Sequence, residues 1–400
     1  MLIERSLFKQ IKPCFNSPEA IIITGMRRTG KTSLLQFIYE RIVSSNKLFL
    51  DLENPLNQKY FEESNYERIK SNLEILGLKF NRRAFLFLDE IQLVRNIPSV
   101  IKYLIDHYQI KCFLTGSASF YLKNLFSESL AGRKYLFELF PLTFREFLLF
   151  KQSPEGEQVP YGAGKIVLPE DSHSISRSVF ETVSNLYEEY ILFGGFPEVV
   201  LKETIEEKKK STEDIFSSFF QLEVLRVGDF KKNKTVRDLM MILMKRIGSK
   251  LDVQKLSQEL KISRPTLYEY LAFLEGTYFI HLVKPFSKSK DVEIRKAPKI
   301  YLCDSGVANH FANLDEGILF ENIIFQNLKI KGEVNYYQRK SGVEIDFIFN
   351  KNKAIEVKLN PREVDLKRLK RLSQELGLKE FIIISKNYSQ LENVQYGFML

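Results

Sequence analysis

The chain has 400 residues, of which 44% are hydrophobic and 27% charged, a composition typical of soluble globular domains rather than of disordered or fibrous chains. Its formal net charge of +9 favours an anionic partner. Because no apolar run is long enough to span a bilayer and the N-terminus does not resemble a signal peptide, we expect a cytoplasmic protein without a membrane partner.

The cysteines argue against a disulfide framework. Cys14, Cys112 and Cys303 are far apart in the sequence and odd in number, which favours a reducing compartment. The four histidines are scattered, and no spacing of Cys and His is typical of a zinc site.

Residues 21–35 read IIITGMRRTGKTSLL, an apolar strand-like run followed by a glycine-rich turn and a helix-like segment. The turn matches the phosphate-loop pattern G-x-x-x-x-G-K-[ST]. Backbone N–H groups of such a loop surround phosphate oxygens, and the positive end of the next helix faces the same anion. The residues predicted to bind a nucleotide are Gly25, Met26, Arg27, Arg28, Thr29, Gly30, Lys31, Thr32 and Ser33.

Within this loop two side chains have specific predicted roles. Lys31 is expected to reach the terminal phosphates, and the Thr32 hydroxyl to hold Mg²⁺. Residues 84–94, AFLFLDEIQLV, then predict a buried parallel strand that delivers two carboxylates at its C-terminal end. Asp89 is expected to hold the Mg²⁺ through water, and Glu90 to act as the general base toward the attacking water.

Two further polar residues each allow two interpretations. Thr115 ends the next strand, followed by Ser117, where a polar side chain either senses the γ-phosphate or caps a helix before Phe120. Arg133 lies between a helix and a strand. It either supplies positive charge to the nucleotide of a neighbouring subunit, which requires a homo-oligomer, or is a surface cation at a helix C-terminus.

The segments GMRRTGKT, FLDEIQ, LTGSAS, ESLAGR…FELFPLTFREF and GGFPEVV together resemble a group of prokaryotic AAA-plus-type ATPases. The resemblance implies ATP binding and hydrolysis by an α/β P-loop domain with a parallel sheet, here residues 1–150. It further implies a winged helix and a C-terminal domain like restriction nucleases. We expect a loop and helical lid at 151–232, with 194–197 as the bend of the lid.

Residues 233–289 predict the winged helix. Apolar spacing indicates helices at 236–247 and 253–260, a third helix capped by Ser263, and a strand at 278–283. The third helix is predicted to leave exposed, toward a DNA major groove, Arg264, Thr266, Tyr268 and Glu269. The lysines predicted to meet DNA phosphates are Lys284, Lys288 and Lys290. Winged helices also serve as protein-interaction modules, so DNA is the favoured partner and a protein the alternative.

Residues 290–400 carry a second set of chemical groups. The pattern predicts a helix with Glu321, three strands, a helix and a strand, with Asp346 on the second strand and Glu356 and Lys358 on the third. Residues two apart on a strand share a face, and carboxylates with a lysine can bind Mg²⁺ and activate water.

This order resembles restriction-endonuclease-like phosphodiesterases. The resemblance implies that Asp346 and Glu356 are metal ligands, that Lys358 orients the water, and that Glu321 is an accessory ligand. Two functions follow. The first is ATP hydrolysis coupled to DNA binding and to DNA cleavage by the C-terminal domain. The second is a nucleotide-dependent switch that binds a protein partner and retains the nuclease-like fold only as a scaffold.

Overall fold

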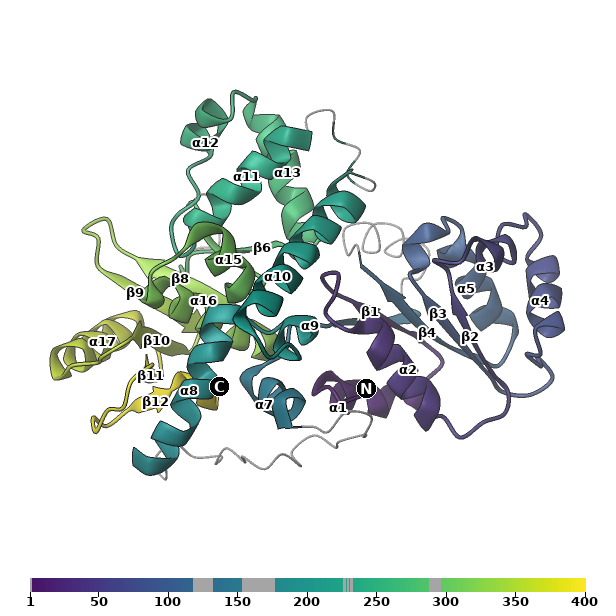
Figure 1. Ribbon diagram of the computed structural model, residues 1–400, viewed down its shortest axis with the longest axis horizontal. Helices are drawn as coiled ribbons and strands as arrows, with labels where there is room; N and C mark the ends of the chain where they lie inside the picture. The colour runs from purple at the N-terminus through teal and green to yellow at the C-terminus, as the bar shows by residue number, and fades with distance from the viewer. Residues whose placement is uncertain are drawn as a thin grey trace. The chain divides into compact units, whose positions relative to one another are not determined.

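The computed structural model describes residues 2–117, 132–152, 177–225, 228, 230, 233–287 and 296–400, which form two compact units (Figure 1). The first unit contains the described residues up to Phe140 with Gly276–Tyr278, and the second contains Pro141–Lys151 and most of the described residues that follow. The division into four domains stays a prediction. The predictions for Phe120, Lys288 and Lys290 lie outside the described residues. So does the predicted loop at 151–175, apart from Lys151 and Gln152, which are helical.

The first unit is an α/β fold around a parallel sheet of five strands in the order β2-β3-β4-β1-β5, which confirms the predicted fold class of this part. Its strands are β1 (Ala20–Thr24), β2 (Lys47–Asp51), β3 (Ala84–Asp89), β4 (Ile110–Gly116) and β5 (Lys134–Glu138). Its longer helices are α2 (Lys31–Arg41), α4 (Tyr66–Ile75) and α5 (Ile97–His107), and its shorter ones are α1 (Leu7–Ile11) and α3 (Pro55–Lys59). Parallel neighbours need such crossover connections.

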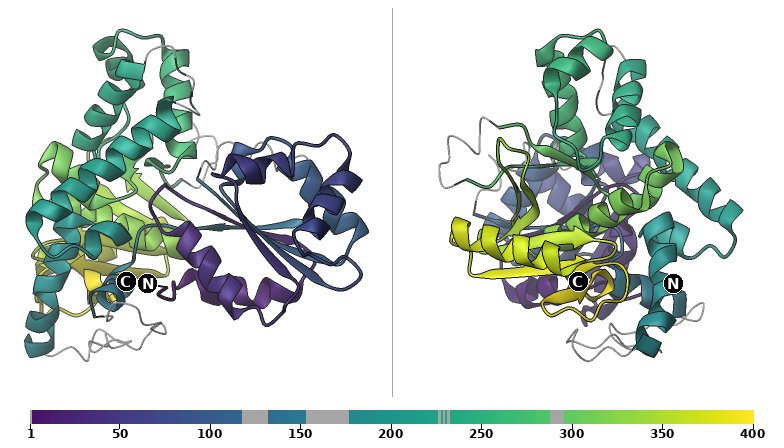
Figure 2. Two further views of the ribbon diagram at one scale, coloured as in Figure 1. Left: turned by 45° about the vertical axis from the view of Figure 1, so that its right-hand side comes forward. Right: turned by 90° about the vertical axis from the view of Figure 1, so that its left-hand side faces the viewer.

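Helices cover both faces of this sheet (Figure 2). Successive side chains of β1 point to opposite faces, so Ile22 packs in one core with α4 and α5, whereas Ile21 and Ile23 pack in another with α1 and α2. Every residue of β1 is buried, as expected for a parallel strand that is covered on both sides. This burial fixes where the carboxyl end of β1, and hence the loop after it, must lie.

The second unit combines helices with two sheets. Its helices are α7 (Phe144–Gln152), α8 (Arg177–Phe193), α9 (Pro197–Val200), α10 (Ile205–Phe219), α11 (Asn233–Lys245), α12 (Val253–Glu259), α13 (Arg264–Gly276), α15 (Ser305–Ala312), α16 (Glu316–Lys331) and α17 (Glu363–Leu376). Its strands are β6 (Ile280–Val283), β7 (Lys299–Leu302), β8 (Val334–Gln338), β9 (Glu344–Phe349), β10 (Lys353–Lys358), β11 (Glu380–Ser385) and β12 (Val394–Tyr396).

Strands β6 and β7 form an antiparallel pair, and the remaining strands form a sheet in the order β12-β11-β10-β9-β8. Strands β8, β9 and β10 are antiparallel neighbours, whereas β10, β11 and β12 are parallel. From α16 onward the structure therefore has the predicted order of helix, three strands, helix and strand, and β12 extends the sheet.

The turn at 194–197, predicted as the bend of a lid, packs against the start of α15. The Gly195 N–H donates to Asp304 Oδ2 at 2.8 Å, and the Val307 N–H donates to Asp304 Oδ1 at 3.0 Å. A Cβ on Gly194, whose φ is +78°, would lie 2.1 Å from Asp304 Oδ1, so glycine is required there. Burial raises the pKa of Asp304 to about 6, although its N–H donors oppose that shift.

The titration of Asp304 gives the first prediction. The folded protein holds on Asp304 a proton that the unfolded chain, with an ordinary pKa near 3.8, releases. The free energy of unfolding that Asp304 contributes therefore falls as pH rises from about 4 to about 6, by at most about 3 kcal/mol. Urea unfolding should show the stability advantage of wild type over Asp304→Asn shrinking across this range.

Asp315→Asn is the matched control, because Asp315 begins α16 without a side-chain capping bond. If the difference in unfolding free energy between wild type and Asp304→Asn instead grew with pH, the raised pKa of Asp304 would be contradicted.

Candidate functional site

The glycine-rich loop connects the buried end of β1 to the first turn of α2. A Cβ on Gly25 would lie 2.1 Å from Leu139 O, so the loop backbone approaches the segment after β5 too closely for any side chain. Gly30 has a φ of +91° immediately before α2. Both glycines are therefore needed to turn the chain from strand to helix within a few residues. Thr32 and Ser33 are exposed on the first turn of α2.

Lys31 folds back over its own loop. Its Nζ donates to Gly25 O at 3.1 Å and to Met26 O at 3.0 Å, and only 5% of the residue is exposed. The Thr29 hydroxyl also donates to Met26 O, at 2.9 Å. The ammonium is therefore held by neutral backbone carbonyls. Hydrogen bonds between two charged groups are stronger, so an anion can replace these carbonyls as its partner.

Asp89 and Thr115 meet at the carboxyl edge of the sheet. Leu88 of β3 is in register with Leu114 of β4, so the residue after each lies at the same edge. The Thr115 hydroxyl donates to Asp89 Oδ1, which also accepts from the Glu90 N–H at 3.2 Å. Asp89 is buried. The structure therefore shows Thr115 as a partner of Asp89, which neither interpretation named. Its role toward a nucleotide stays a prediction, and the helix cap before Phe120 lies outside the described residues.

Glu90 is held in a small polar network that the sequence interpretation did not include. Its carboxylate accepts a hydrogen bond from Gln92 Nε2, and the Ser117 hydroxyl lies 3.5 Å from Oε2. Gln92 Nε2 in turn lies 3.0 Å from Ser117 Oγ. Glu90 also has a left-handed backbone, with a φ of +54°, which is unusual for a residue with a side chain. The only sequence signal for Gln92 was its place in the segment FLDEIQ.

The predicted arginines have partners of their own. Arg27 forms an ion pair with Glu53 at 2.8 Å, and Arg28 is exposed with a φ of +68°. Arg133 Nε donates to Asp106 Oδ1 at 2.7 Å. To act on a neighbouring subunit Arg133 would have to leave this ion pair, and that role stays a prediction.

Arg5 is a buried arginine that the sequence interpretation missed. Its guanidinium donates to Thr29 O in the loop and to Phe140 O after β5, both at 2.8 Å, and only 4% of the residue is exposed. It therefore ties the glycine-rich loop to the segment that also touches Gly25. The available signal was weak, since Arg5 is one charged residue between the apolar Ile3 and Phe8.

In the second unit, the predicted carboxylates lie on α16, β9 and β10. Asp346 Oδ2 accepts the Val357 N–H at 2.8 Å. Glu356 Oε1 lies 3.0 Å from Lys358 Nζ and also pairs with Arg368 of α17, and the residue is only 2% exposed. Glu321 Oε1 accepts from the Tyr301 hydroxyl at 2.6 Å.

Burial shifts the acidity of these carboxylates. Desolvation, followed by repulsion from Asp346, raises the pKa values of Glu321 and Glu356 to about 7 each. Desolvation also raises the pKa of Asp346 itself. Because the Asp346 carboxylate raises the pKa values of both Glu321 and Glu356, the three predicted acids form one electrostatic cluster.

Lys299, Glu344 and Arg368 belong to this cluster and were not predicted. Lys299 Nζ lies 3.8 Å from Glu321 Oε1 and 3.6 Å from Glu344 Oε1. Within the described ranges, no three His, Cys, Asp or Glu side chains converge closely enough to hold a metal ion as they stand. Glu356 Oε2 is nevertheless buried without a hydrogen-bond partner, an oxygen that a hard cation would satisfy.

Helices α11, α12 and α13 occupy the region predicted as a winged helix. The Thr266 N–H donates to Ser263 Oγ at 3.2 Å, so α13 has the expected cap. Tyr268 is 57% exposed, and Arg264 and Glu269 are exposed as predicted. Thr266 was predicted to be exposed toward DNA, but it is half-buried, and its hydroxyl forms a hydrogen bond with the Ser263 hydroxyl as part of the cap. Lys284 is exposed directly after β6.

Family comparisons agree with the geometry of the first unit. Residues 17–148 match a protein family described as an AAA domain. These residues form an AAA-type P-loop domain. Residues 184–317 and 316–398 match two families described as domains of unknown function, DUF8612 and DUF4143.

The similarity to other proteins extends beyond the AAA domain to most of the chain. The chain is 28% identical to an uncharacterized protein of Methanocaldococcus jannaschii over 89% of this chain and 79% of the relative. It is 26% identical to an uncharacterized protein of Haemophilus influenzae over 93% of this chain and 90% of the relative. The Aeropyrum pernix ORC1 protein in complex with DNA is a structural neighbour with 13% identity and a TM-score of 0.34, covering 77% of this chain and 90% of that one.

Across the described ranges, every helix is too short or too polar to cross a membrane.

Arg5 gives a prediction for the AAA domain. Arg5→Ala removes two charged hydrogen bonds and leaves Thr29 O and Phe140 O without this donor, so we expect the free energy of unfolding to fall by about 2–4 kcal/mol. Hydrogen exchange of the loop amides should accelerate as well. Arg68→Ala is the control, because Arg68 is exposed and its ion pair with Glu63 is long, at 3.8 Å. Equal effects of Arg5→Ala and Arg68→Ala on stability and exchange would contradict the role of Arg5 in holding the glycine-rich loop to Phe140.

Proposed function

We propose that the AAA domain binds ATP and hydrolyses it. The observation that carries the proposal is that the loop before Lys31 follows β1, while Asp89 ends β3 and Glu90 follows it, at the carboxyl edge of the same parallel sheet. This loop requires glycine at Gly25 and turns through Gly30. The loop amides and Lys31 would hold the phosphates. The Glu90 carboxylate would give up its hydrogen bond with Gln92 and accept the proton of the attacking water.

The donor set at this edge suits magnesium. Thr32 and Asp89 supply the oxygen ligands that this ion prefers, and Thr115 orients the Asp89 carboxylate. Bound magnesium would neutralise negative charge that develops on the phosphates. A role of Arg133 in a homo-oligomer belongs to the same proposal and requires that its ion pair with Asp106 open.

We further propose that α11–α13 with β6 and β7 form a winged helix that contacts DNA. Support comes from the net charge of +9, from the exposed Arg264 and Tyr268 on α13, and from the exposed Lys284. Such contacts release counterions, so binding should weaken steeply with added salt.

The C-terminal carboxylates fit a phosphodiester-cleaving site. Asp346 and Glu356 would hold a divalent metal, with Glu321 as an accessory ligand and Lys358 orienting the water. The metal would supply Lewis-acid activation of that water. The restriction-nuclease-like fold of residues 290–400 is supported by the element order from α16 to β11.

One observation favours the alternative, a nucleotide-dependent switch that binds a protein and cuts nothing. Glu356 is already neutralised by two cations, Lys358 and Arg368. A carboxylate paired in this way is stable without a metal, so the nuclease-like sheet can persist as a scaffold.

Lys31 tests the ATPase proposal. We expect Lys31→Ala to lower ATP turnover by about 100-fold or more, because it removes the cation that faces the phosphates. Glu90→Gln should retain ATP binding and lose turnover, because the amide cannot accept the proton. Phosphate release and ATP affinity would be measured for both variants. Lys102→Ala, an exposed lysine on α5, is the control. Magnesium-dependent turnover that survives Lys31→Ala would refute the assignment.

Cleavage of supercoiled plasmid DNA, with magnesium or manganese and with or without ATP, tests the C-terminal site. Lys358→Ala and Asp346→Asn should each reduce nicking by about 100-fold or more. Nicking by wild type should rise from about pH 6 to about pH 8, because the metal needs the ionised forms of Glu321 and Glu356, whose pKa values are about 7.

Lys353→Ala is the control for this experiment, since Lys353 lies on the same strand but pairs with Glu380 at 3.3 Å away from the cluster. Absence of nicking with either metal would favour the protein-binding switch.

A further inference from the structure

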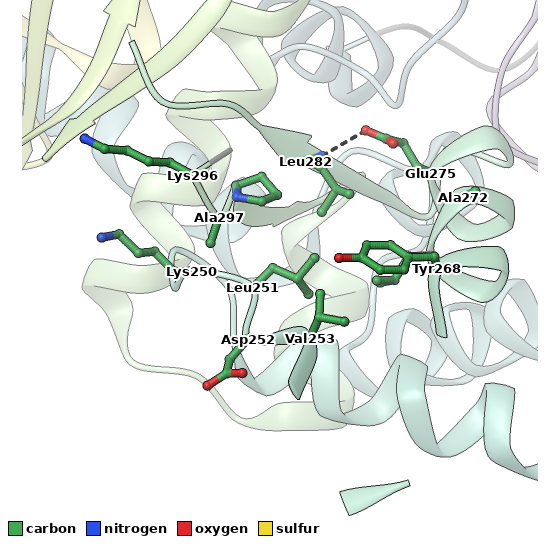
Figure 3. Close-up of a pocket in the computed structure, with 12 residues that line it drawn as sticks. Lys250, Leu251, Asp252, Val253, Tyr268, Ala272, Glu275, Leu282, Lys296 and Ala297 are labelled. Carbon is green, nitrogen blue, oxygen red and sulfur yellow. Dashed lines mark hydrogen bonds between the residues drawn. The ribbon is translucent and has the colours of Figure 1, made fainter. Parts of the chain in front are cut away.

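A cavity of about 690 Å³ lies beside α13, a size typical of ligand pockets (Figure 3). Three parts of the second unit line it: residues 250–253, the exposed side of α13, and residues of β6 together with the segment that enters β7. Of the residues that line it, only Tyr268 belongs to the DNA-contacting surface proposed above.

One wall of the cavity is apolar and carries an aromatic ring. Leu251, Val253, Leu282 and Pro298 contribute aliphatic surface. Figure 3 shows the Tyr268 ring beside Leu251, Val253 and Leu282. Tyr268 is 57% exposed, and its ring has no aromatic or hydrogen-bond partner within the described ranges. An exposed tyrosine beside an aliphatic wall is a surface on which a planar apolar group can stack.

The other end of the cavity is positively charged. Lys250 and Lys296 extend in the same direction, away from Tyr268 (Figure 3). Neither lysine forms an ion pair within the part of the chain that the structure describes.

The two carboxylates that line the cavity are already engaged. Asp252 accepts the Lys255 N–H at 2.9 Å, and Glu275 accepts the Leu282 N–H at 3.2 Å. Each carboxylate keeps its negative charge, so positive charge is confined to the end toward which Lys250 and Lys296 extend, whereas Glu275 lies at the other end beside Leu282 (Figure 3).

We propose that this cavity holds one nucleotide of a single-stranded DNA segment, with the base stacked on Tyr268 and its phosphate between Lys250 and Lys296. A stacking platform beside free cations is the combination by which proteins hold single strands without reading sequence. The proposal rests on the DNA-directed function proposed above and adds to it the form of DNA that is bound.

Two of the segments that line the cavity continue to residues that lie close to Glu321 of the carboxylate cluster. Lys250 forms a β-bridge with Lys299, which directly follows the cavity residue Pro298 and whose Nζ lies 3.8 Å from Glu321 Oε1. A Cβ on Gly248, two residues before Lys250, would lie 3.4 Å from Glu321 Oε1. A strand anchored in the cavity therefore lies next to the segments that carry the proposed cleavage site.

The test uses the full chain without divalent metal and a single strand of about 12 nucleotides that carries one 2-aminopurine. Anisotropy measures affinity, and quenching of the 2-aminopurine fluorescence measures stacking. Tyr268→Ala should weaken binding by about 10-fold and abolish the quenching, whereas Tyr268→Phe should keep both. Ala272→Leu, which fills the cavity from the exposed side of α13, should act as Tyr268→Ala does.

The lysines are tested by salt dependence. The double variant Lys250→Ala/Lys296→Ala should reduce the slope of log affinity against log salt by about 0.7, since the two lysines hold one phosphate and each neutralised phosphate on a single strand contributes about 0.7. Lys210→Ala, an exposed lysine on α10, is the control and should leave the slope unchanged.

The outcomes separate this proposal from the function on which it rests. If wild type binds the strand but Tyr268→Ala, Ala272→Leu and the double lysine variant bind equally well, the cavity proposal is wrong and DNA binding stands. If wild type binds only the matching duplex, the single-strand proposal is wrong and the winged-helix proposal stands. If wild type binds neither single-stranded nor duplex DNA, the cavity proposal and the winged-helix proposal are both wrong. The ATPase proposal is tested separately by ATP turnover.

Discussion

The parallel pairing of β4 with both β1 and β3 is the constraint on which the AAA domain depends. Thr24 is in register with Gly116, and Leu88 with Leu114, so the glycine-rich loop, Asp89 and Thr115 are brought to one edge. Burial of the apolar side chains on both faces of the sheet enforces this register, since sliding a strand by one residue would exchange its two faces. The position of Lys31 relative to the two carboxylates thus follows from packing.

Two buried carboxylates of the second unit, Asp304 and Glu356, are stabilised in different ways. Asp304 is satisfied by backbone N–H groups, and its role is to join the turn at 194–197 to α15. Glu356 is satisfied by side-chain cations instead and keeps one buried oxygen without a partner. Burying an anion is costly unless hydrogen bonds or opposite charges compensate. Backbone partners are fixed by the fold, whereas Lys358 and Arg368 can move, so Glu356 is better suited to a change of partner than Asp304.

The AAA domain also carries local strain where its chemistry is proposed. Glu90 has a left-handed backbone and lies between Asp89 and the pair of Gln92 and Ser117. Such a conformation costs of order 1 kcal/mol or more and persists only when the surroundings impose it. Here the buried strand β3 precedes Glu90, and the contacts of its carboxylate with Gln92 and Ser117 hold its side chain.

The sequence by itself determined those features whose residues are contiguous in the chain. The strand, loop and helix around Lys31, the apolar run before Asp89, the cap of α13 at Ser263 and the order of elements from α16 to β11 all depend on local periodicity and local hydrogen bonds. Thr266 was predicted wrongly because its hydroxyl joins that cap, a choice that helical spacing does not decide.

Only the tertiary structure decided the partners that come from distant segments. Arg5 reaches Thr29 and Phe140, Lys299 reaches Glu321, and Arg368 reaches Glu356. These contacts depend on how separate elements pack, and hydrophobic periodicity specifies which face of an element is buried without specifying which polar side chain will meet it there.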